Sequence, residues 1–557
     1  MPTIKLNKER VKELIGKDLS DEKLKELIPY LGTDLEEINE EEIVVEIFPN
    51  RPDLLSDEGF SRSFGSFIGE KTGLKEYKSE NSKYNLYIKK EVEKVRPYTA
   101  CAVIKGLKID ENKLKDIIEI QEKLHVTYGR NRKKCAIGIY PMENIKWPIT
   151  YTAKKPDEIK FVPLEKTEEL TGRQIIEKHE KGKEYAHLLE GKEMYPVFID
   201  ANNEILSMPP IINSHKTGKI SESTKDVFIE CSGFNFEVLS KAINIIVTAL
   251  NDMGGKIYGV TLNYEHSSLG KIVTPKLQFE KTFLNKNYIK KYLGLELSDE
   301  KVVECLEKMG FGVKVQKHFF DVFVPCYRTD IIHQIDLIED LAIGYGYDNI
   351  EEDNNRVYSL GKENYSEKIF RKIREHFVGL GMNETNTYSL VSKEIQTKLV
   401  EDFVCIKNSF SSEFNSMRRN IMINLLYNLK NNKMYDYPQN LFEIGVVFKK
   451  DSSCKNLIKE FNSLAVIFCF ENSNFTTAKQ ALDSLFQALD LEYYVKKGDL
   501  KIYMEGRSGK IIFNDQIIGH VGEISPEAIS LFELEMPCSG FELELDNLIN
   551  VLKKKNN

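Results

Sequence analysis

The sequence has 557 residues, which at about 150 residues per domain corresponds to roughly three or four domains. Hydrophobic residues make up 41% and charged residues 29%, a balance that excludes a disordered chain. The net charge of −8 excludes a basic field over the whole chain, so contact with nucleic acid would need a local basic patch.

No apolar run approaches the ~20 residues that span a bilayer, and the first residues lack an apolar signal segment. The nine cysteines are scattered, and no two form a CxxC pair. That spacing argues against a zinc ribbon or a disulfide framework and fits a reducing compartment. We therefore expect a cytoplasmic protein with no membrane contact.

A segment near the start of the chain recurs past its middle. Residues 7–32 align with residues 285–310 at one constant offset of 278, and apolar residues recur in both at helical spacing. Each copy is expected to form two short helices, the second beginning after a serine N-cap and ending at a glycine. These residues are Ser20 and Gly32 in the first copy, and Ser298 and Gly310 in the second.

The similarity continues into the next segment of each copy. Residues 46–55 resemble residues 322–332 at an offset of 277, and in both a strand, a proline and an Arg-x-Asp step precede a new helix. The pattern predicts two copies of a small α+β module. Chance similarity of two helical hairpins is the alternative, and the constant offset over many residues argues against it.

The remaining segments have a different character. Residues 88–268 separate the two copies, and residues 360–557 mix helical and strand patterns. Within the latter, 371–380 predicts an amphipathic helix, and 441–448 and 464–470 predict strands of a substantial sheet.

The second copy carries four carboxylates where the first has one. Asp336, Glu339 and Asp340 follow helical i, i+3, i+4 spacing and share one face, and Asp330 falls at the expected N-cap of that helix. Acids this close repel one another unless a cation compensates, and a hard cation with oxygen ligands, above all Mg2+, suits them. A capped helix with a solvated acidic face and a cluster of interfacial salt bridges are the alternatives. The first-copy counterparts are Asp53, Gly59, Arg62 and Ser63.

Four long, irregular motifs lie along the chain. They are FPNRPDLLSDEG at 48–59, MPPIINSHKTG at 208–218, VPCYRTDIIHQIDLIEDLAIGYGYDNI at 324–350 and NLFEIGVVF at 440–448. These motifs resemble those of the phenylalanyl-tRNA synthetase β-subunit family in its archaeal and eukaryotic-cytosolic form. The resemblance extends over nearly the full chain, to about residue 546.

The resemblance implies one subunit of an α2β2 class II aminoacyl-tRNA synthetase that joins phenylalanine to tRNA(Phe). ATP and phenylalanine would bind through the α subunit, and Asp330, Asp336, Glu339 and Asp340 would hold Mg2+. The expected fold class is α+β and multidomain. It comprises a first α+β module at 1–87, an α/β editing domain at 88–268, a second module with the Mg2+ site at 269–352, and a noncatalytic class II synthetase-like antiparallel-sheet domain at 353–557 that contacts the α subunit.

The C-terminal domain lacks residues that a class II active site needs. Such a site uses arginines whose forked guanidinium groups hold phosphate oxygens, one of them in a late GxGxxR motif. The sequence contains no such motif. Arg418 and Arg419 stand in a plausible position for the other arginine, and a structural role is the alternative.

The resemblance also implies that the middle domain hydrolyses tyrosine wrongly attached to tRNA(Phe). A phenylalanine pocket rejects one added hydroxyl poorly, whereas a pocket that hydrogen-bonds the hydroxyl disfavours phenylalanine. The implied pocket consists of Phe198, Ser207, Glu230 and Ser232, with Glu230 accepting the phenolic proton or orienting water. The sequence offers no nucleophile constellation, so a positioned water and backbone dipoles would carry the hydrolysis.

Several positions depart from the family pattern. Archaeal members tend to have Asp and Thr where this chain has Glu230 and Ser232, and often His-Asp where it has Tyr140 and Pro141. The alternative function is a noncatalytic tRNA-binding and assembly scaffold whose editing has decayed. The basic stretch 128–134 is a candidate for phosphate contact with the tRNA acceptor end, with a solvated loop as its alternative.

Overall fold

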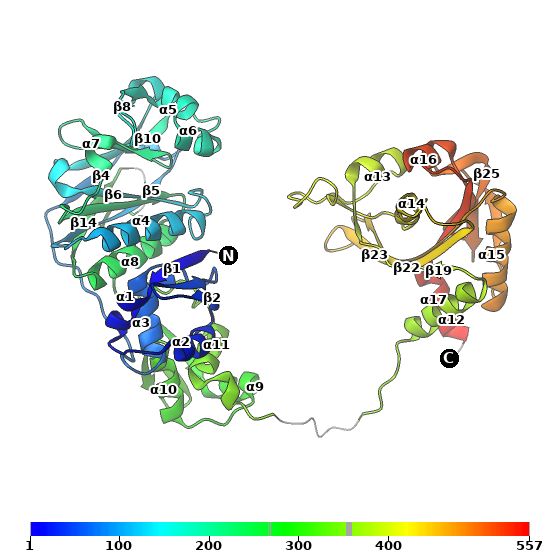
Figure 1. The fold of residues 1–557 in the computed structure, drawn as a ribbon, viewed down its shortest axis with the longest axis horizontal. Coiled ribbons are helices and arrows are strands. Elements are labelled where there is room, and N and C mark those ends of the chain that lie inside the picture. The colour runs from blue at the N-terminus through cyan, green and yellow to red at the C-terminus, as the bar shows by residue number, and fades with distance from the viewer. Residues whose placement is uncertain (1, 266, 268, 353–358, 556–557) are drawn as a thin grey trace. The chain divides into compact units, whose positions relative to one another are not determined.

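The computed structural model describes residues 2–265, 267, 269–352 and 359–555. The chain forms two compact units, Met1–Asn354 and Asn355–Asn557, and each is taken by itself (Figure 1). Residues 268 and 353, where two of the expected domain boundaries fall, lie outside the described residues. Within the described ranges, no helix combines the length and the apolar composition needed to cross a membrane.

The first unit begins and ends with copies of one small module. Each copy has a three-stranded antiparallel sheet, in the order β1-β3-β2 in the first and β16-β18-β17 in the second. The first copy consists of β1 (Thr3–Asn7), α1 (Lys8–Ile15), α2 (Asp21–Tyr30), β2 (Asp34–Ile38), β3 (Glu42–Glu46) and α3 (Asp57–Phe67). The second consists of β16 (Glu280–Asn285), α9 (Lys286–Leu293), α10 (Asp299–Lys308), β17 (Gly312–Val315), β18 (Phe319–Val324) and α11 (Gln334–Tyr345).

The helix limits expected in both copies are confirmed. Ser20 and Ser298 have extended backbone, and each accepts a hydrogen bond from the backbone N–H three positions later. Gly32 and Gly310 follow the second helices with φ of 88° and 82°, a left-handed conformation that favours glycine.

A ten-stranded sheet forms the middle of the first unit. Its strands run in the order β12-β11-β10-β7-β4-β14-β5-β13-β6, and β15 pairs with β14 outside that path. The pairs β4·β7 and β4·β14 are parallel, and the others are antiparallel. The strands are β4 (Asn85–Ile88), β5 (Tyr98–Lys105), β6 (Cys135–Pro141), β7 (Ile149–Lys154), β10 (Tyr195–Ile199), β11 (Ile205–Met208), β12 (Ile212–Asn213), β13 (Val227–Gly233), β14 (Lys256–Tyr264) and β15 (Lys271–Thr274).

Helices cover this sheet on both sides. The long helices α4 (Glu111–Val126) and α8 (Phe236–Asp252) lie between the sheet and the first module (Figure 1). Shorter elements lie beyond the opposite face: β8 (Lys160–Phe161), β9 (Leu170–Thr171), α5 (Gly172–Lys178), α6 (Glu180–Tyr185) and α7 (His215–Gly218).

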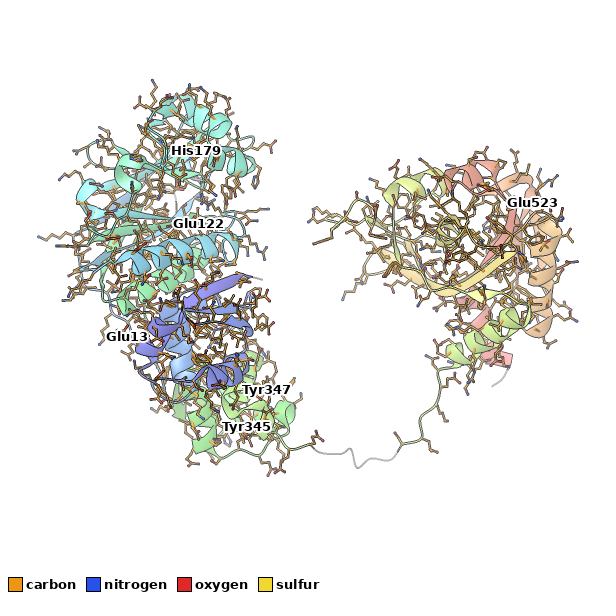
Figure 2. The ribbon with its side chains drawn as sticks, in the orientation of Figure 1. Glu13, Glu122, His179, Tyr345, Tyr347 and Glu523 are labelled. Carbon is orange, nitrogen blue, oxygen red and sulfur yellow. The ribbon has the colours of Figure 1, made fainter. Side chains whose placement is uncertain are left out.

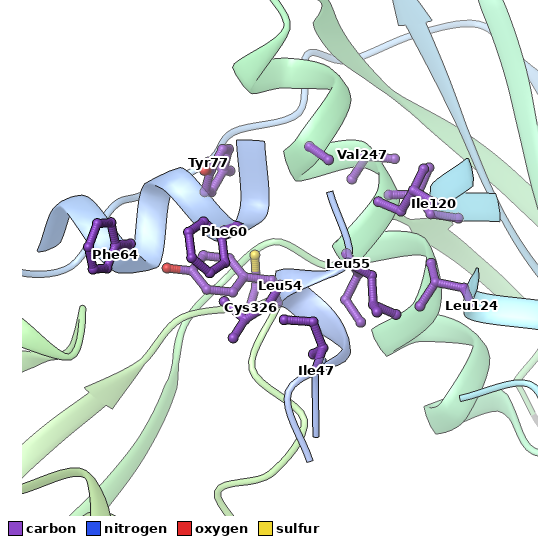
Figure 3. Packing of buried hydrophobic residues seen from close by; sticks show 14 of the residues in the cluster. Ile47, Leu54, Leu55, Phe60, Phe64, Tyr77, Ile120, Leu124, Val247 and Cys326 are labelled. Atoms are coloured by element: carbon purple, nitrogen blue, oxygen red, sulfur yellow. The ribbon is translucent and has the colours of Figure 1, made fainter. Parts of the chain in front are cut away.

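One apolar core joins the first module to the middle sheet. Leu54 and Leu55, from the turn before α3, belong to the same cluster as Ile120 of α4 and Val247 of α8 (Figure 3). Cys326, from the loop after β18, reaches that cluster as well (Figure 3). Because the modules and the sheet share this core, the first unit packs as one body.

The second unit is built on a seven-stranded sheet in the order β19-β22-β23-β27-β26-β25-β24. The pair β19·β22 is parallel and the others are antiparallel. Helices α12, α15 and α17 pack on one face, and α13, α14 and α16 on the other. The strands are β19 (Asn383–Glu384), β22 (Gln439–Lys450), β23 (Ile458–Cys469), β24 (Tyr494–Lys497), β25 (Tyr503–Phe513), β26 (Gln516–Ile524) and β27 (Cys538–Glu544), besides the small pair β20 (Leu390–Val391) and β21 (Ser416–Met417).

The elements expected in this unit are confirmed. The helix expected at 371–380 is part of α12, and the strands expected at 441–448 and 464–470 match β22 and β23. The helices are α12 (Tyr365–Gly379), α13 (Lys393–Leu399), α14 (Met422–Asn431), α15 (Phe475–Ala488), α16 (Pro526–Leu531) and α17 (Leu545–Lys555). The whole chain is thus a mixed α/β multidomain protein.

Candidate functional site

Glu230 is held by a strand that has neighbours on both sides. β13 pairs with β5 and with β6, and its side chains alternate between the two faces of the sheet. Ile229 and Cys231 join the core that contains α4 and α8. Glu230 therefore points to the other face, where Phe228 packs, and only 2% of Glu230 is exposed.

The hydroxyl of Tyr140 lies at the centre of the hydrogen bonds around Glu230. Its hydroxyl donates to Ser207 Oγ at 2.7 Å, and it lies 3.2 Å from Glu230 Oε1 and 3.4 Å from Asn213 Oδ1. Gly138 permits this approach, because a Cβ at that position would overlap the phenolic oxygen. The second carboxyl oxygen, Glu230 Oε2, is buried and has no hydrogen-bond partner among the described residues.

Burial decides the charge of this network. It raises the pKa of Glu230 to about 8, although Arg96 and the nearby hydroxyls of Tyr140 and Ser232 oppose the shift. Burial also raises the pKa of Tyr140 well above its usual value. At neutral pH both groups are therefore mostly protonated, and Glu230 can donate to Tyr140 while Tyr140 donates to Ser207.

Ser232 lies two residues further along β13 and has a different partner. Arg96, which is fully buried, donates from Nε to Ser232 Oγ at 3.1 Å and from Nη2 to the Ser232 carbonyl at 2.6 Å. Although Glu230 and Ser232 share a strand face, the hydroxyl of Ser232 is bound by Arg96 and the carboxyl of Glu230 by Tyr140.

Phe198 lies on β10 beside Ser207 of β11, to which it is paired in the sheet. Its ring is fully buried and stacks on Tyr151, with ring centroids 4.3 Å apart. Of the implied pocket residues, Ser207 and Glu230 thus meet at one phenol, whereas Phe198 and Ser232 make neighbouring contacts.

A cavity of about 540 Å3 lies beside this network. Glu230 and Asn213 line it, and so does Glu122 of α4, which is labelled in Figure 2. Much of its wall consists of isoleucine and proline side chains. Among the residues that the structure describes, Glu230 is the one member of the implied pocket that lines the cavity.

The basic stretch after α4 has one buried cation. Arg132 donates from Nη1 to the Ile211 carbonyl at 2.8 Å and from Nη2 to Glu122 at 3.0 Å, and its guanidinium lies 4.4 Å from the centre of the Tyr185 ring. Arg132 therefore has structural contacts, and it also lines the cavity of about 540 Å3. The exposed cations of the stretch are Arg130, Lys133 and Lys134.

Arg328 organises the acidic cluster of the second module. Both carboxylate oxygens of Asp330 bind its guanidinium, at 2.8 and 2.7 Å, and its Nη2 also donates to Asp340 at 2.6 Å. The expectation that Asp330 caps the helix is wrong, because His333 occupies the N-cap of α11. Asp336 completes that cap by accepting the backbone N–H of His333 at 2.7 Å.

The charge of this cluster is only partly compensated. Burial alone would raise the pKa of Asp330, but the guanidinium of Arg328 holds this pKa below its usual value. Partial burial and the neighbouring carboxylates raise the pKa of Glu339. The oxygen donors suit Mg2+ chemically, yet they do not form a metal cage by themselves. Over the described ranges, no group of three or more His, Cys, Asp or Glu side chains is placed to hold a metal ion.

The two arginines that precede α14 differ in their surroundings. Arg418 is buried, pairs with Glu443 at 2.6 Å and donates to the Val446 carbonyl at 2.8 Å. Arg419 lines a cavity of about 510 Å3 within the second unit, with its guanidinium above the ring of Phe461. Arg418 therefore has a structural role, which was one of its two alternatives.

Sequence reasoning marked Tyr140 only as a departure from the family pattern, and it predicted neither the contacts of Tyr140 nor the role of Arg96. Arg96 and Tyr140 contact residues 136 and 67 positions away in the chain. Patterns along one sequence connect residues a few positions apart and do not reveal such pairs. A glycine two positions before Tyr140 is the local signal that a large side chain folds back over the strand.

Four family models match consecutive segments of the chain. They are the Phe-tRNA synthetase beta subunit B1 domain at 1–70, the B3/4 domain at 81–247, the tRNA synthetase B5 domain at 282–347 and the phenylalanyl tRNA synthetase beta chain CLM domain at 355–545. The candidate cavity and Glu230 belong to the second segment, and the acidic cluster to the third.

Whole relatives match as well. The phenylalanine–tRNA ligase beta subunits of Pyrococcus horikoshii and Methanosarcina barkeri are 37% and 36% identical to this chain, over 98% and 99% of it and 99% of each relative. A solved N-terminal fragment of the phenylalanyl-tRNA synthetase beta subunit from Pyrococcus horikoshii is 39% identical, with a TM-score of 0.59, and covers 62% of this chain and 100% of the fragment. These similarities confirm the resemblance seen in the motifs, and the chain belongs to the phenylalanyl-tRNA synthetase (phenylalanine–tRNA ligase) β-subunit family.

Proposed function

We propose that this chain is the β subunit of a cytoplasmic α2β2 ligase that charges tRNA(Phe) with phenylalanine at the expense of ATP. The observation that carries the proposal is the 37% identity to a phenylalanine–tRNA ligase beta subunit over 98% of the chain. ATP and phenylalanine would bind to a separate α subunit. The second unit would be a class II synthetase-like surface for that subunit, and the ion pair of Arg418 with Glu443 supports a noncatalytic role.

Coexpression with the α subunit tests this assignment. The two chains should copurify as an α2β2 complex that catalyses phenylalanine-dependent ATP–pyrophosphate exchange and charges tRNA(Phe). The β chain alone should do neither, because it lacks the arginine motif of a class II active site. Robust exchange by the pure β chain would contradict the noncatalytic assignment, and failure to copurify would contradict the complex.

For the cavity of the middle domain there are two candidate functions. Hydrolysis of mischarged Tyr-tRNA(Phe) would use the implied residues Phe198, Ser207, Glu230 and Ser232. The second candidate function is that of a scaffold that does not hydrolyse Tyr-tRNA(Phe). The hydrogen bonds of Tyr140 with Ser207 and Glu230 favour it, because they engage two residues of the implied pocket.

Deacylation of Tyr-tRNA(Phe) by the assembled complex separates the two functions. If the cavity edits tyrosine, Glu230→Ala should slow deacylation by roughly ten- to a hundredfold, the value of a hydrogen bond to a charged or strongly polar partner. Charging with phenylalanine should stay nearly unchanged. If neither wild type nor variant deacylates Tyr-tRNA(Phe), the scaffold function holds.

We also propose a Mg2+ ion at Asp330, Asp336, Glu339 and Asp340. Asp330 and Asp340 share one buried arginine, Arg328, and Glu339 and Asp336 add further negative charge beside them. Carboxylate oxygens are the donors that Mg2+ prefers. Water or groups outside this chain would complete the coordination. The ion would stabilise the second module and has no assigned step in catalysis.

Calorimetric titration with Mg2+ tests the site on the full chain and on the α2β2 complex. Glu339→Gln should weaken binding at least tenfold, because it removes a carboxylate that takes no part in the helix cap. Glu304→Gln is the matched control, since Glu304 is an exposed acid of the same module that pairs with lysines. Equal affinities of wild type and Glu339→Gln would leave the cluster as a capped helix with salt bridges.

A further inference from the structure

Three polar side chains of the middle domain converge on one phenol, and that phenol belongs to the chain itself. Ser207 Oγ, Glu230 Oε1 and Asn213 Oδ1 all lie within 3.4 Å of the Tyr140 hydroxyl. A phenolic oxygen has one proton to donate and two lone pairs to accept with. The hydroxyl of Tyr140 therefore occupies the point at which the polar groups of these three side chains are directed.

A second phenol in the adjoining cavity could not bind the same three oxygens. Glu230 and Asn213 line the cavity, but the oxygens named above face Tyr140. The remaining oxygen, Glu230 Oε2, is buried, and within the described part of the chain it has no partner. The nearby wall contains apolar side chains, Ile137 and Ile211 among them. A tyrosyl group entering this space could not place its hydroxyl where Tyr140 has its own, and it would lose the three contacts that converge there.

A buried tyrosine that serves only packing does not need such a set of partners. Tyr151, which is also fully buried in this domain, donates to a single backbone carbonyl, that of Arg96, at 2.8 Å. Tyr140 instead gathers three side chains from three strands or loops, and Gly138 clears the space that its hydroxyl occupies. The arrangement is that of a binding site with its ligand in place.

We propose that Tyr140 is an internal ligand that closes a phenol-binding site and so determines the substrate class of the cavity. With Tyr140 in place, the cavity accepts an apolar aminoacyl group without a hydroxyl and disfavours tyrosine. Without it, Ser207, Asn213 and Glu230 form a site selective for tyrosine. The proposal rests on the proposed function of this domain at aminoacyl-tRNA, and it names the residue that sets its specificity.

Binding of free amino acids to the full-length chain tests the site directly. Calorimetry would compare L-tyrosine with L-phenylalanine for wild type, Tyr140→Ala, Tyr140→His and Tyr140→Phe. Tyr140→Ala should bind L-tyrosine at least tenfold more tightly than L-phenylalanine, because the freed polar groups are left unpaired by phenylalanine. Tyr140→His, a shorter polar ring, should show the same preference and serves if the alanine variant fails to fold.

Tyr140→Phe is the matched control. It keeps a ring in the site and removes only the hydroxyl, so it should show no preference for tyrosine, like the wild type. Trp147 fluorescence during urea unfolding would establish that each variant is folded. A tenfold preference for tyrosine in the wild type would overturn the proposal, and so would folded Tyr140→Ala or Tyr140→His without such a preference.

Deacylation by the α2β2 complex separates this proposal from the function on which it rests. Tyr140→His should deacylate Tyr-tRNA(Phe) at least tenfold faster than wild type. If no variant deacylates Tyr-tRNA(Phe) but the tyrosine preference appears in binding, the hydrolytic function fails and the role of Tyr140 stands. If deacylation occurs in the wild type and is no faster in the folded variants, the role of Tyr140 is overturned.

Discussion

The two modules of the first unit bury the same arginine–aspartate fork in different electrostatic surroundings. In the first, Arg51 is bound by both oxygens of Asp53 at 2.9 Å and donates to Ser63 at 3.0 Å. In the second, Arg328 is bound by its own aspartate in the same way and donates to Asp340 at 2.6 Å. Ser63 and Asp340 are equivalent positions of the repeat. A serine in the first copy and an aspartate in the second, at one position of the repeat, thus make the difference between a neutral hydrogen bond and a second ion pair.

The first module accommodates its buried acids in another way. Asp57 and Glu58, in the first turn of α3, are buried, and burial raises their pKa values to about 8 and about 7. The equivalent positions of the second module are Gln334 and Ile335. In the first module burial thus favours the protonated form of Asp57 and Glu58, although Arg10 lies 3.6 Å from Glu58 Oε1, whereas the second module pairs both Asp330 and Asp340 with one arginine. The same fold accommodates both solutions because the charges lie at different helix positions.

The largest expected effect comes from removing the arginines. Arg328→Ala removes the ion-pair partner of two buried carboxylates, which the nearby Arg51 compensates only in part, and should lower the free energy of unfolding by about 4–5 kcal/mol. Arg51→Ala removes the partner of one and should cost about 3 kcal/mol. Urea denaturation followed by the fluorescence of Trp147, the single tryptophan, measures both in the first unit. Equal losses of stability in the two variants would show that the ion pair between Arg328 and Asp340 adds nothing to the stability.

A smaller effect should appear in the pH dependence of the first module. Because the folded pKa values of Asp57 and Glu58 lie above their unfolded values near 4, the folded state binds protons that the unfolded state releases. Stability is therefore greatest below about pH 4 and falls as the pH rises toward 8. Between pH 5.5 and 7 the loss should be about 3–4 kcal/mol, because the two acids together keep nearly two protons in the folded state. The double variant Asp57→Asn, Glu58→Gln should flatten the profile, and an unchanged slope would contradict this assignment.

The smallest effect should come from making the second module resemble the first. Asp340→Ser, measured without Mg2+, should change the free energy of unfolding by about 1 kcal/mol or less, because Arg328 keeps its fork with Asp330 and gains a neutral acceptor. The same Trp147 denaturation experiment applies. A loss above about 3 kcal/mol would mean that Arg328 depends on Asp340 in a way that Arg51 does not depend on Ser63.

Local features of the fold could be predicted from the sequence, and distant contacts could not. The helix caps at Ser20 and Ser298 follow from side-chain hydrogen bonds within three residues, and the repeat makes each prediction twice. The strands at 441–448 and 464–470 follow from apolar β-branched composition.

The site residues show where such prediction ends. Glu230 could be placed on a strand face, but its main partner, Tyr140, lies 90 positions away and meets it only through sheet pairing. Arg132 looked like part of a solvated basic stretch, and its burial depends on Pro210 and Ile211, which follow it by 78 and 79 positions. Asp330 stood at a plausible N-cap, but its carboxylate binds Arg328 and His333 caps the helix.

The two copies of the module also meet each other, and they do so reciprocally. At the end of α3 in the first copy, Ser66 Oγ donates to the Glu307 carbonyl near the end of α10 in the second. At the end of α11, Ile343 lies against Gly32, just after α2 of the first. Ser66 and Ile343 are equivalent positions of the repeat, so each copy places the end of its last helix near the end of the other copy's second helix, much as the two sides of a two-fold dimer interface do. In a homodimer every substitution appears on both sides at once. Within one chain the two sides evolve independently, so an acidic cluster can form on one side without a mirror image facing it.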